Sequence, residues 1–557
     1  MKRRFTTICL AVCLVVTLSA ARVANAPAET DWQTVAIGID YREFRASGPN
    51  NVFVARMDRS NPNVTLDSSL GNGFLAEPSS GYPYGRQTVR GQAGLHDQSI
   101  GYWGRVWGSR NRVVVAINGY YFDDYTGVPW RGQSQSGWYI KRFDNMETGS
   151  GFSWTLNGDA FIGECVTHYA QKQKIKFLET DTFLYLNGLN RERRSDELIL
   201  YTSQYFSNTK TDASGVEVVV EMSRPVSLYS AQDGIAGTIK AVRNGQGASP
   251  IQFDHIVLSA SGTAAADLLA NANEGQQIGV FQEMANFALD IENGKCDSNS
   301  KLSSLDWTNT YASIGGDFYF LRNGIIHAYT QKNQATVRDP RTAIAFNDQY
   351  IFFIVVDGRN PGVSVGMRIS ELAQFARDTL GATYGIAEDS GGSSTMVVNG
   401  EVKNNTTCNF TDCAKTTDLS ATPSPPLYYN RQPAPVEANG LLGEVTGDQV
   451  EALVANGMMM VSVEPRYQSN NYVQDDFITL SSPTNIRLGP GTNYAIIDTL
   501  SSTDGVVLDH PLNGVYARGW SWWKVKFGPT IGWVAQTPTW PFSLSLPFIS
   551  NLNPLAR

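Results

Sequence analysis

One short stretch of the chain limits the possible folds more than any other. Residues 351–356 are all apolar and end abruptly at the polar sequence Asp357-Gly358-Arg359. A run of this length and composition is typical of a buried strand. Apolar residues then recur at helical spacing between Ile369 and Leu380, and the following Gly381 is a typical helix stop. Residues 383–387 form a second predicted strand.

This strand–helix–strand order predicts where two polar loops lie. Two strands joined by such a helix are expected to be parallel, with a right-handed crossover. Parallel strands end at the same edge of a sheet, where α/β proteins tend to bind ligands. Asp357 and Asp389, each in the loop after a strand, are therefore expected at one edge. The predicted fold class is α+β or mixed α/β, with a mixed sheet and helices.

Length and charge set further bounds. A chain of 557 residues is long for one domain and predicts two to four. The formal net charge of −8 and the lack of a basic run argue against nucleic-acid binding.

The N-terminus has the features of a secretory signal at residues 1–26. Lys2-Arg3-Arg4 precedes an apolar segment from Ile8 to Leu18, and Ala24-Asn25-Ala26 fits a cleavage site. The alternative is an uncleaved membrane anchor, but the apolar segment is shorter than the roughly 20 residues that a span needs. We therefore expect a secreted or cell-envelope protein with no membrane span after cleavage.

The cysteines support an oxidising compartment. Four remain after cleavage, and an even number in a secreted chain favours disulfides over metal ligation. Cys408 and Cys413 are close enough to close a small loop, which leaves Cys165 with Cys296, one of three possible connectivities.

Composition also predicts the domain boundaries. We expect a first domain at residues 30–466, with the Pro-rich segment 422–435 as a loop inside it. A compact all-β domain is expected at 470–536, after a polar boundary. The Pro- and Ser-rich residues 537–557 are expected to form a tail.

The loop after the second strand carries the clearest chemistry. Its sequence, Asp389-Ser390-Gly391-Gly392-Ser393-Ser394, offers a carboxylate, hydroxyl groups and backbone N–H groups that can hold an anion. Arg341 and Arg359 are candidates for charge-assisted hydrogen bonds to a phosphate. No phosphate-binding loop, zinc motif or EF-hand loop occurs, and none of the five histidines is paired at metal-ligand spacing. No cofactor is predicted, and a metal requirement is left open.

Several ordered motifs resemble the phosphodiester glycosidase family, most densely at residues 310–405. The matching segments are Asn118 to Phe122, Asn190 with Arg193, Gly315-Gly316, Pro340 to Ala343, Val356 to Arg359, Gly366-Met367 and Asp389 to Ser394. The resemblance implies Asp357 or Asp389 as the catalytic carboxylate. The residues that it implies for substrate binding are Asn118, Arg193, Gly316, Arg341, Thr342, Arg359, Gly391, Gly392, Ser393 and Ser394. Ser390 departs from the family, which usually has glycine there, and a position that needs positive φ would be strained by serine.

The resemblance implies a glycosidase that hydrolyses a sugar-1-phosphodiester to free sugar and a phosphomonoester, acting on envelope or extracellular glycan. Two alternatives remain open. One is a non-catalytic glycan-binding protein, which Ser390 favours. The other is a phosphodiesterase that releases sugar-1-phosphate.

The last part of the chain resembles a bacterial SH3-like domain. The segments that carry this resemblance are Thr484 to Gly491, Trp522 to Lys526 and Ile531 to Val534. Such domains imply cell-wall peptide or glycan as a partner. We expect Trp523 and Trp533 in the core, and Trp520 and Trp522 lining a groove.

Overall fold

The computed structural model describes residues 31–75, 85–123, 126–149, 151–229, 231–290, 295–302, 305, 307–316, 319–406, 413–415 and 450–536. The predicted signal sequence, the Pro-rich segment, the tail and Cys408 lie outside these residues. The fold is mostly β, with 48% strand and 11% helix. The expected α+β or mixed α/β class is therefore wrong.

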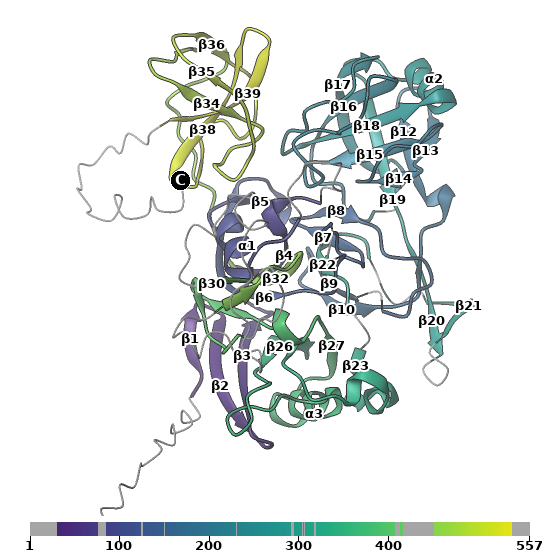
Figure 1. The fold of residues 1–557 in the computed structure, drawn as a ribbon. Coiled ribbons are helices and arrows are strands. Elements are labelled where there is room, and N and C mark those ends of the chain that lie inside the picture. Colours follow the sequence, from purple (N-terminus) through teal and green to yellow (C-terminus); the bar gives the residue numbers. More distant parts are fainter. Residues whose placement is uncertain are drawn as a thin grey trace, which may run out of the picture.

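An eight-stranded sheet contains the apolar run at residues 351–356 (Figure 1). Its strands, in order across the sheet, are β1 (Gln33–Ala36), β2 (Ile39–Ala46), β3 (Asn50–Asp58), β26 (Tyr350–Val356), β25 (Arg341–Phe346), β27 (Tyr384–Ala387), β23 (Tyr319–Arg322) and β24 (Ile325–Ile326). Every neighbouring pair in this sheet is antiparallel, so this sheet is not mixed. A parallel pair occurs in another sheet, between residues 188–189 and residues 199–200.

The two strands predicted to pair in parallel are separated by β25. Both β26 and β27 run antiparallel to β25 and therefore point in the same direction. Their carboxyl ends reach one edge of the sheet, as expected, and β25 begins at that same edge. The predicted parallel neighbours are wrong, but the shared edge is confirmed.

Strand β26 is apolar throughout because both of its faces are buried. Ile351, Phe353 and Val355 join one hydrophobic core, and the alternate residues face another. The second core is covered by helix α3 (Ile369–Gln374), which continues as a π-helical turn to Thr379. This is the predicted helix, and Gly381 follows it with φ +69°.

Two further sheets pack against the other core. The first contains β29 (Glu401–Val402), β28 (Met396–Val398), β6 (Ser109–Asn118), β32 (Asn456–Glu464) and β4 (Val64–Leu70), with β5 (Ile100–Gly101) beside β6. The second contains β10 (Ala160–Gly163), β9 (Gly151–Thr155), β22 (Thr310–Ile314), β7 (Gln133–Gln135) and β8 (Trp138–Lys141). Helix α1 (Val89–His96) covers the outer face of the first.

A second eight-stranded sheet occupies the middle of the chain. Its order is β13 (Thr182–Tyr185), β12 (Gln173–Phe177), β19 (Gln277–Gln282), β17 (Ile235–Asn244), β16 (Gly215–Met222), β18 (His255–Ser261), β15 (Leu198–Thr202) and β14 (Gly188–Leu189). Helix α2 (Gly262–Asn271) packs beside it, and a small sheet contains β11 (Val166–Thr167), β20 (Ala285–Asp290) and β21 (Lys295–Leu302). A disulfide joins Cys165 to Cys296, which confirms that predicted pairing.

The C-terminal strands form a separate sheet. It contains β33 (Phe477–Thr479), β36 (Asp504–Val507), β38 (Trp520–Phe527), β39 (Thr530–Gln536), β34 (Thr484–Arg487) and β35 (Ile496–Leu500), with β37 (Val515–Ala517) beside β38. A short pair, β30 (Cys413–Lys415) and β31 (Val450–Ala452), completes the strands. Trp523 and Trp533 are buried as expected, but Trp522 is also buried, so its predicted place in a groove is wrong. The SH3-like assignment stays a prediction.

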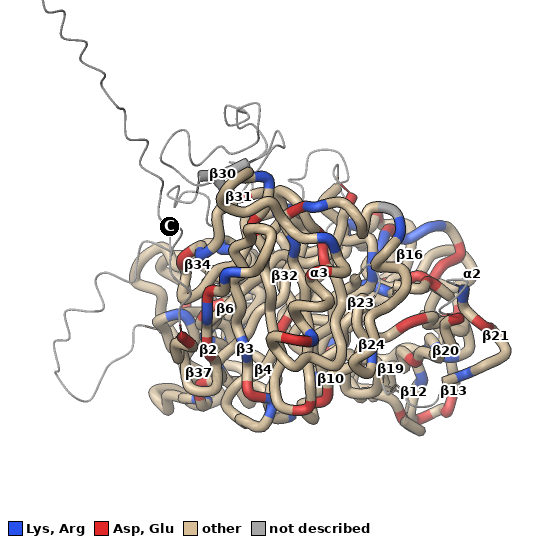
Figure 2. The backbone as a smooth tube through the Cα atoms, turned by 90° about the horizontal axis from the view of Figure 1, so that it is seen from below, with Lys and Arg blue, Asp and Glu red and all other residues tan. Residues whose placement is uncertain are grey.

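The C-terminal sheet contacts the rest of the chain through both apolar and charged groups. The rings of Phe253 and Trp533 lie 5.6 Å apart, and Lys524 Nζ lies 2.8 Å from Glu221. Figure 2 shows Lys and Arg interspersed with Asp and Glu along the elements in view. Among the described residues, no helix is long and apolar enough to cross a membrane.

Candidate functional site

The edge shared by β26, β25 and β27 brings the predicted loops together. In the sheet register, Arg341 at the start of β25 lies opposite Val356, the last residue of β26. On the other side of β25, the Glu388 backbone N–H donates to the Thr342 carbonyl at 3.0 Å. The loops that begin at Asp357 and Asp389 therefore flank the first residues of β25.

Asn118, the last residue of β6, ties this edge to the neighbouring sheet. Its Nδ2 donates to the Asp389 carbonyl at 2.9 Å, and its Oδ1 accepts from Thr342 Oγ1 at 2.7 Å. The same Oδ1 accepts from the Thr395 backbone N–H at 3.1 Å. Because Asn118 is fully buried, these bonds are not weakened by water, and they fix both ends of the 389–395 loop.

The Gly/Ser loop has one position that requires glycine, and it is not the position of Ser390. Ser390 has φ −125° and ψ −179°, an extended conformation that any residue adopts. Gly391 has φ +75°, and a Cβ atom there would lie 2.6 Å from Arg359 Nη2. The departure from the family pattern at Ser390 therefore causes no backbone strain, whereas Gly391 allows Arg359 to approach the loop.

Two arginines meet the loop at these neighbouring positions. Arg341 Nη1 donates to Ser390 Oγ at 3.1 Å, while its Nε donates to the Met367 carbonyl at 2.9 Å. Arg359, which follows β26 with φ +60°, donates from Nε to Asp339 Oδ1 at 2.8 Å. Both guanidinium groups are thus held in place beside the Ser390–Gly391 backbone.

The two carboxylates have different surroundings. Burial raises the pKa of Asp357 to about 7, against the opposing effects of hydrogen bonds from Asn404, Asn405 and Asn51 and the charge of Arg45. Asp357 Oδ1 accepts from the Asn405 backbone N–H at 3.0 Å. Asp357 is therefore surrounded by groups that link β3 and the turn after β29 to the end of β26.

Asp389 is held mainly through its backbone. Its N–H donates to the Gly119 carbonyl at 3.0 Å, and its carbonyl accepts from Asn118. Its side-chain Oδ1 accepts from the backbone N–H of Ser390 at 2.8 Å. These bonds hold Asp389 at the start of the loop whose next two residues, Ser390 and Gly391, lie close to Arg341 and Arg359.

The other predicted residues divide into two groups. Gly392, Ser393 and Ser394 are buried in the loop, and Ser394 Oγ has no hydrogen-bond partner among the described residues. At Gly316, an added Cβ would lie 2.3 Å from Ile386 Cδ1, so glycine permits close packing against β27. Arg193 lies in the loop between β14 and β15 of the middle sheet.

Arg193 is bonded within that middle sheet. Its Nη1 donates to Ser259 Oγ and its Nη2 to Asp212 Oδ1, both at 2.8 Å. Among the described contacts, none joins Arg193 to the loop at Asp389. The structure therefore does not bring Arg193 together with the other predicted residues.

Sequence reasoning missed the asparagines that support the site. Asn404 Nδ2 donates to the Ser394 carbonyl at 2.9 Å, and its Oδ1 accepts from the Met396 N–H at 2.8 Å. The backbone carbonyl of Asn456 accepts a hydrogen bond from the backbone N–H of Gly119 at 2.8 Å. The only sequence signal at Asn456 is the pair Asn-Gly, which is typical of a turn, although here it begins β32.

Exposed aromatic side chains lie beside this edge. Tyr121, three residues beyond Asn118, is 37% exposed, and Trp130 is 55% exposed. Their rings lie 5.9 Å apart. Aromatic faces of this kind are suited to contact with the apolar face of a sugar ring.

One group with metal-ligand geometry occurs in the described parts of the chain, away from the loop. It consists of Glu221, Asp254 and His510, whose ligand atoms lie within 4.8 Å of one another. Lys524 Nζ lies 2.8 Å from Glu221 Oε1, and Lys240 Nζ lies 2.6 Å from Oε2. These lysines already neutralise the carboxylate, so the group is better described as an ion-pair network that holds the C-terminal sheet.

Residues 234–416 match the family described as phosphodiester glycosidase. The match supports a glycosidase-type hydrolase, and it includes the Asp357 and Asp389 loops but not Asn118 or Asn456. A search of curated proteins gives no match for the chain.

Two solved structures show distant similarity. A hypothetical protein from Synechocystis is 16% identical with a TM-score of 0.43; the match covers 79% of this chain and 64% of that one. The zebrafish N-acetylglucosamine-1-phosphodiester alpha-N-acetylglucosaminidase catalytic domain, auto-inhibited by its pro-peptide, is 13% identical with a TM-score of 0.31. That match covers 78% of this chain and 84% of the zebrafish chain.

Proposed function

We propose that this protein is a secreted glycosidase that hydrolyses a sugar-1-phosphodiester of envelope or extracellular glycan, releasing free sugar and a phosphomonoester. The observation that carries this proposal is that Arg341 contacts Ser390 and Arg359 lies close to Gly391, on the loop that begins at Asp389. Two fixed cations on a loop that also carries a carboxylate suit a substrate that has a phosphate next to the bond to be broken.

The phosphate of the substrate reduces the need for general-acid catalysis. Cleavage of the bond between the anomeric carbon and oxygen lets the phosphomonoester depart with the bridging oxygen and the electron pair. Because the arginines stabilise that negative charge, a strong general acid is less necessary than for an ordinary glycoside. Water supplies a hydroxyl group to the sugar, and its remaining proton goes to a carboxylate or to solvent.

We assign the acting carboxylate to Asp389 rather than Asp357. Both carboxylates are buried, but Asp357 accepts hydrogen bonds from neighbouring asparagines, which suits a positioning residue. Asp389 lies on the same loop as the backbone N–H groups and serines proposed to bind phosphate. Its charge is therefore placed to stabilise an oxocarbenium-like centre or to activate water.

One observation favours the non-catalytic alternative. Ser390 Oγ accepts a hydrogen bond from Arg341 Nη1. A bound phosphate would have to compete with Ser390 for this hydrogen bond. Loss of this donor weakens phosphate binding but leaves Arg359 in place. We therefore retain glycan binding without turnover as the second proposal.

Product analysis distinguishes these functions. The purified protein is incubated with a synthetic N-acetylglucosamine-1-phosphodiester that has a simple alcohol as its aglycone. Free sugar with an alkyl phosphate supports the glycosidase. Sugar-1-phosphate with free alcohol identifies a phosphodiesterase, and saturable binding without products identifies a binding protein.

A further inference from the structure

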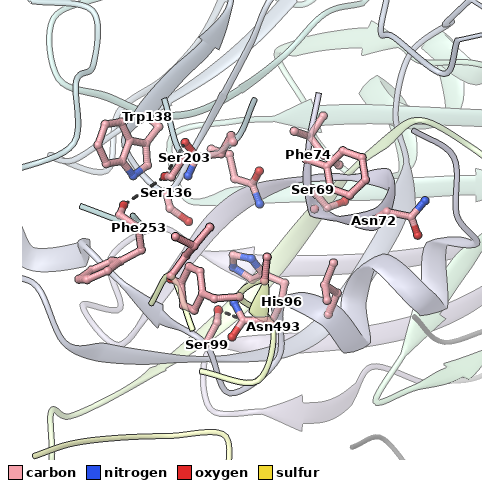
Figure 3. Close-up of a pocket in the computed structure, with 18 of the residues that line it drawn as sticks. Ser69, Asn72, Phe74, His96, Ser99, Ser136, Trp138, Ser203, Phe253 and Asn493 are labelled. Carbon is pink, nitrogen blue, oxygen red and sulfur yellow. Dashed lines mark hydrogen bonds between the residues drawn. The ribbon is translucent and has the colours of Figure 1, made fainter. Parts of the chain in front are cut away.

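A cavity lies where the C-terminal sheet meets the rest of the molecule. Its volume is about 360 Å³, within the range of small-molecule sites. Its walls come from helix α1, from β8, from the segment after β15 and from the turn between β34 and β35. Figure 3 shows Trp138, Phe253, His96 and Phe74 among the side chains around this space.

The lining has a distinctive chemistry. Eleven of its residues are Ser, Thr, Asn or Gln, and six are Phe, Trp or Tyr. None of the residues that line it is Lys, Arg, Asp or Glu. His96 is its one histidine, and His96 Nε2 lies 3.3 Å from the buried Asp67. Such a surface has no charge to balance a phosphate, a carboxylate or a cation.

Some polar groups of the lining are available to a ligand. Gln135 Nε2, Gln204 Nε2 and Ser207 Oγ belong to half-buried residues, and none of these atoms forms a hydrogen bond with a described residue. By contrast, Ser136 Oγ donates to Asp67 at 2.6 Å and Ser99 Oγ donates to the His96 carbonyl at 2.6 Å. The cavity thus combines rigid, satisfied polar groups with a few unsatisfied donors.

We propose that this cavity binds a neutral sugar unit. A sugar offers several hydroxyl groups for amide and hydroxyl partners, and it offers an apolar face for aromatic rings. A charged sugar-phosphate does not suit a lining without compensating charge. The site differs in chemistry from the loop at Asp389, where two arginines are placed, and it does not depend on the proposed catalytic function.

Ligand-observed NMR with four neutral disaccharides tests this proposal: cellobiose, maltose, lactose and N,N′-diacetylchitobiose. The full-length protein is used, and glucose 1-phosphate serves as the charged probe. We expect at least one disaccharide to bind with a Kd on the order of 1 mM, and glucose 1-phosphate not to compete with it.

Three variants test whether the disaccharide that is detected by NMR binds in this cavity. Ala495, an exposed lining residue on the β34–β35 turn, is replaced by tryptophan to fill the space. Ser501→Trp is the matched control, because Ser501 is an exposed turn residue of the same sheet that does not line the cavity. Gln204→Ala removes one free donor without adding bulk, which keeps the test valid if Ala495→Trp fails to fold.

We expect Ala495→Trp to abolish disaccharide binding, Gln204→Ala to weaken it by about tenfold, and Ser501→Trp to leave it unchanged. The proposal is overturned if none of the four disaccharides binds, or if binding survives both cavity variants. The assignment to a neutral sugar is also overturned if glucose 1-phosphate displaces the bound disaccharide. It is overturned as well if an uncharged peptide displaces the bound disaccharide.

Discussion

Replacement of Asp357 by asparagine is expected to change how the stability of the protein depends on pH. Burial raises the pKa of Asp357 from 3.8 to about 7. At 1.36 kcal/mol per pKa unit, this shift corresponds to about 4 kcal/mol. The native state holds the proton more tightly than the unfolded state does. The stabilising contribution is therefore complete below about pH 4 and is lost as the pH rises through about 7.

The assay compares the free energy of unfolding of the wild type and Asp357→Asn by urea denaturation between about pH 4 and about pH 8. Burial also raises the pKa of Glu164 and of Glu451 to about 7, but both residues are present in the two proteins, so their contributions cancel in the difference. Asp348→Asn is the matched control, because Asp348 is exposed in the turn before β26.

The wild type is expected to lose about 4 kcal/mol relative to Asp357→Asn as the pH rises across this window. A difference in the free energy of unfolding that is the same at every pH has no bearing on the predicted loss, because asparagine changes the local hydrogen bonds at every pH. Only the change of this difference with pH tests the prediction. A difference that does not vary with pH contradicts the buried placement of the Asp357 carboxyl. The Asp348→Asn control is expected to follow the wild type.

Three further changes test the site. Asp389→Asn is expected to abolish turnover without changing the circular dichroism spectrum, and full activity would remove Asp389 from the mechanism. Ser390→Gly removes the hydrogen bond from Arg341 Nη1 to Ser390 Oγ, so KM for the phosphodiester is expected to fall by up to about tenfold in initial-rate assays; an unchanged KM would mean that this bond does not compete with the phosphate. Asn118→Ala leaves Thr342 Oγ1 and other buried groups without partners, so urea denaturation should show a loss of about 3–5 kcal/mol, and a loss below about 1 kcal/mol would contradict the role of Asn118.

Local patterns in the sequence predicted several elements correctly. The buried strand at residues 351–356, the helix after residue 369 and its glycine stop are confirmed. These features depend on spacing and turn chemistry within a few residues, which a sequence contains directly.

The sheet was predicted incorrectly for a physical reason. A central antiparallel strand covered on both faces has the same continuous apolar run as a parallel strand. Strand β26 is such a strand, since α3 covers one face and other sheets cover the opposite face. The preceding β25 lies between the two strands that the helix joins, and their sequences give no sign of this insertion.

The site was predicted in part. The Asp357 and Asp389 loops meet at one edge because β26 and β27 point the same way, a consequence that holds with a strand between them. The support from Asn118 spans 271 positions along the chain, and only the fold reveals it. Arg193 was predicted at the site but bonds to Ser259 of the middle sheet instead. A short motif does not indicate which sheet lies next to it in the fold.

Hydrolysis in ¹⁸O-labelled water tests the central claim most directly. If water attacks the anomeric carbon, mass spectrometry should find no label in the alkyl phosphate, which leaves with the bridging oxygen; label in the free sugar is not diagnostic, because its anomeric oxygen exchanges with water. The same products should be missing with Asp389→Asn. Label in the phosphate of sugar-1-phosphate would contradict the account, because the broken bond would then be between phosphorus and the aglycone oxygen.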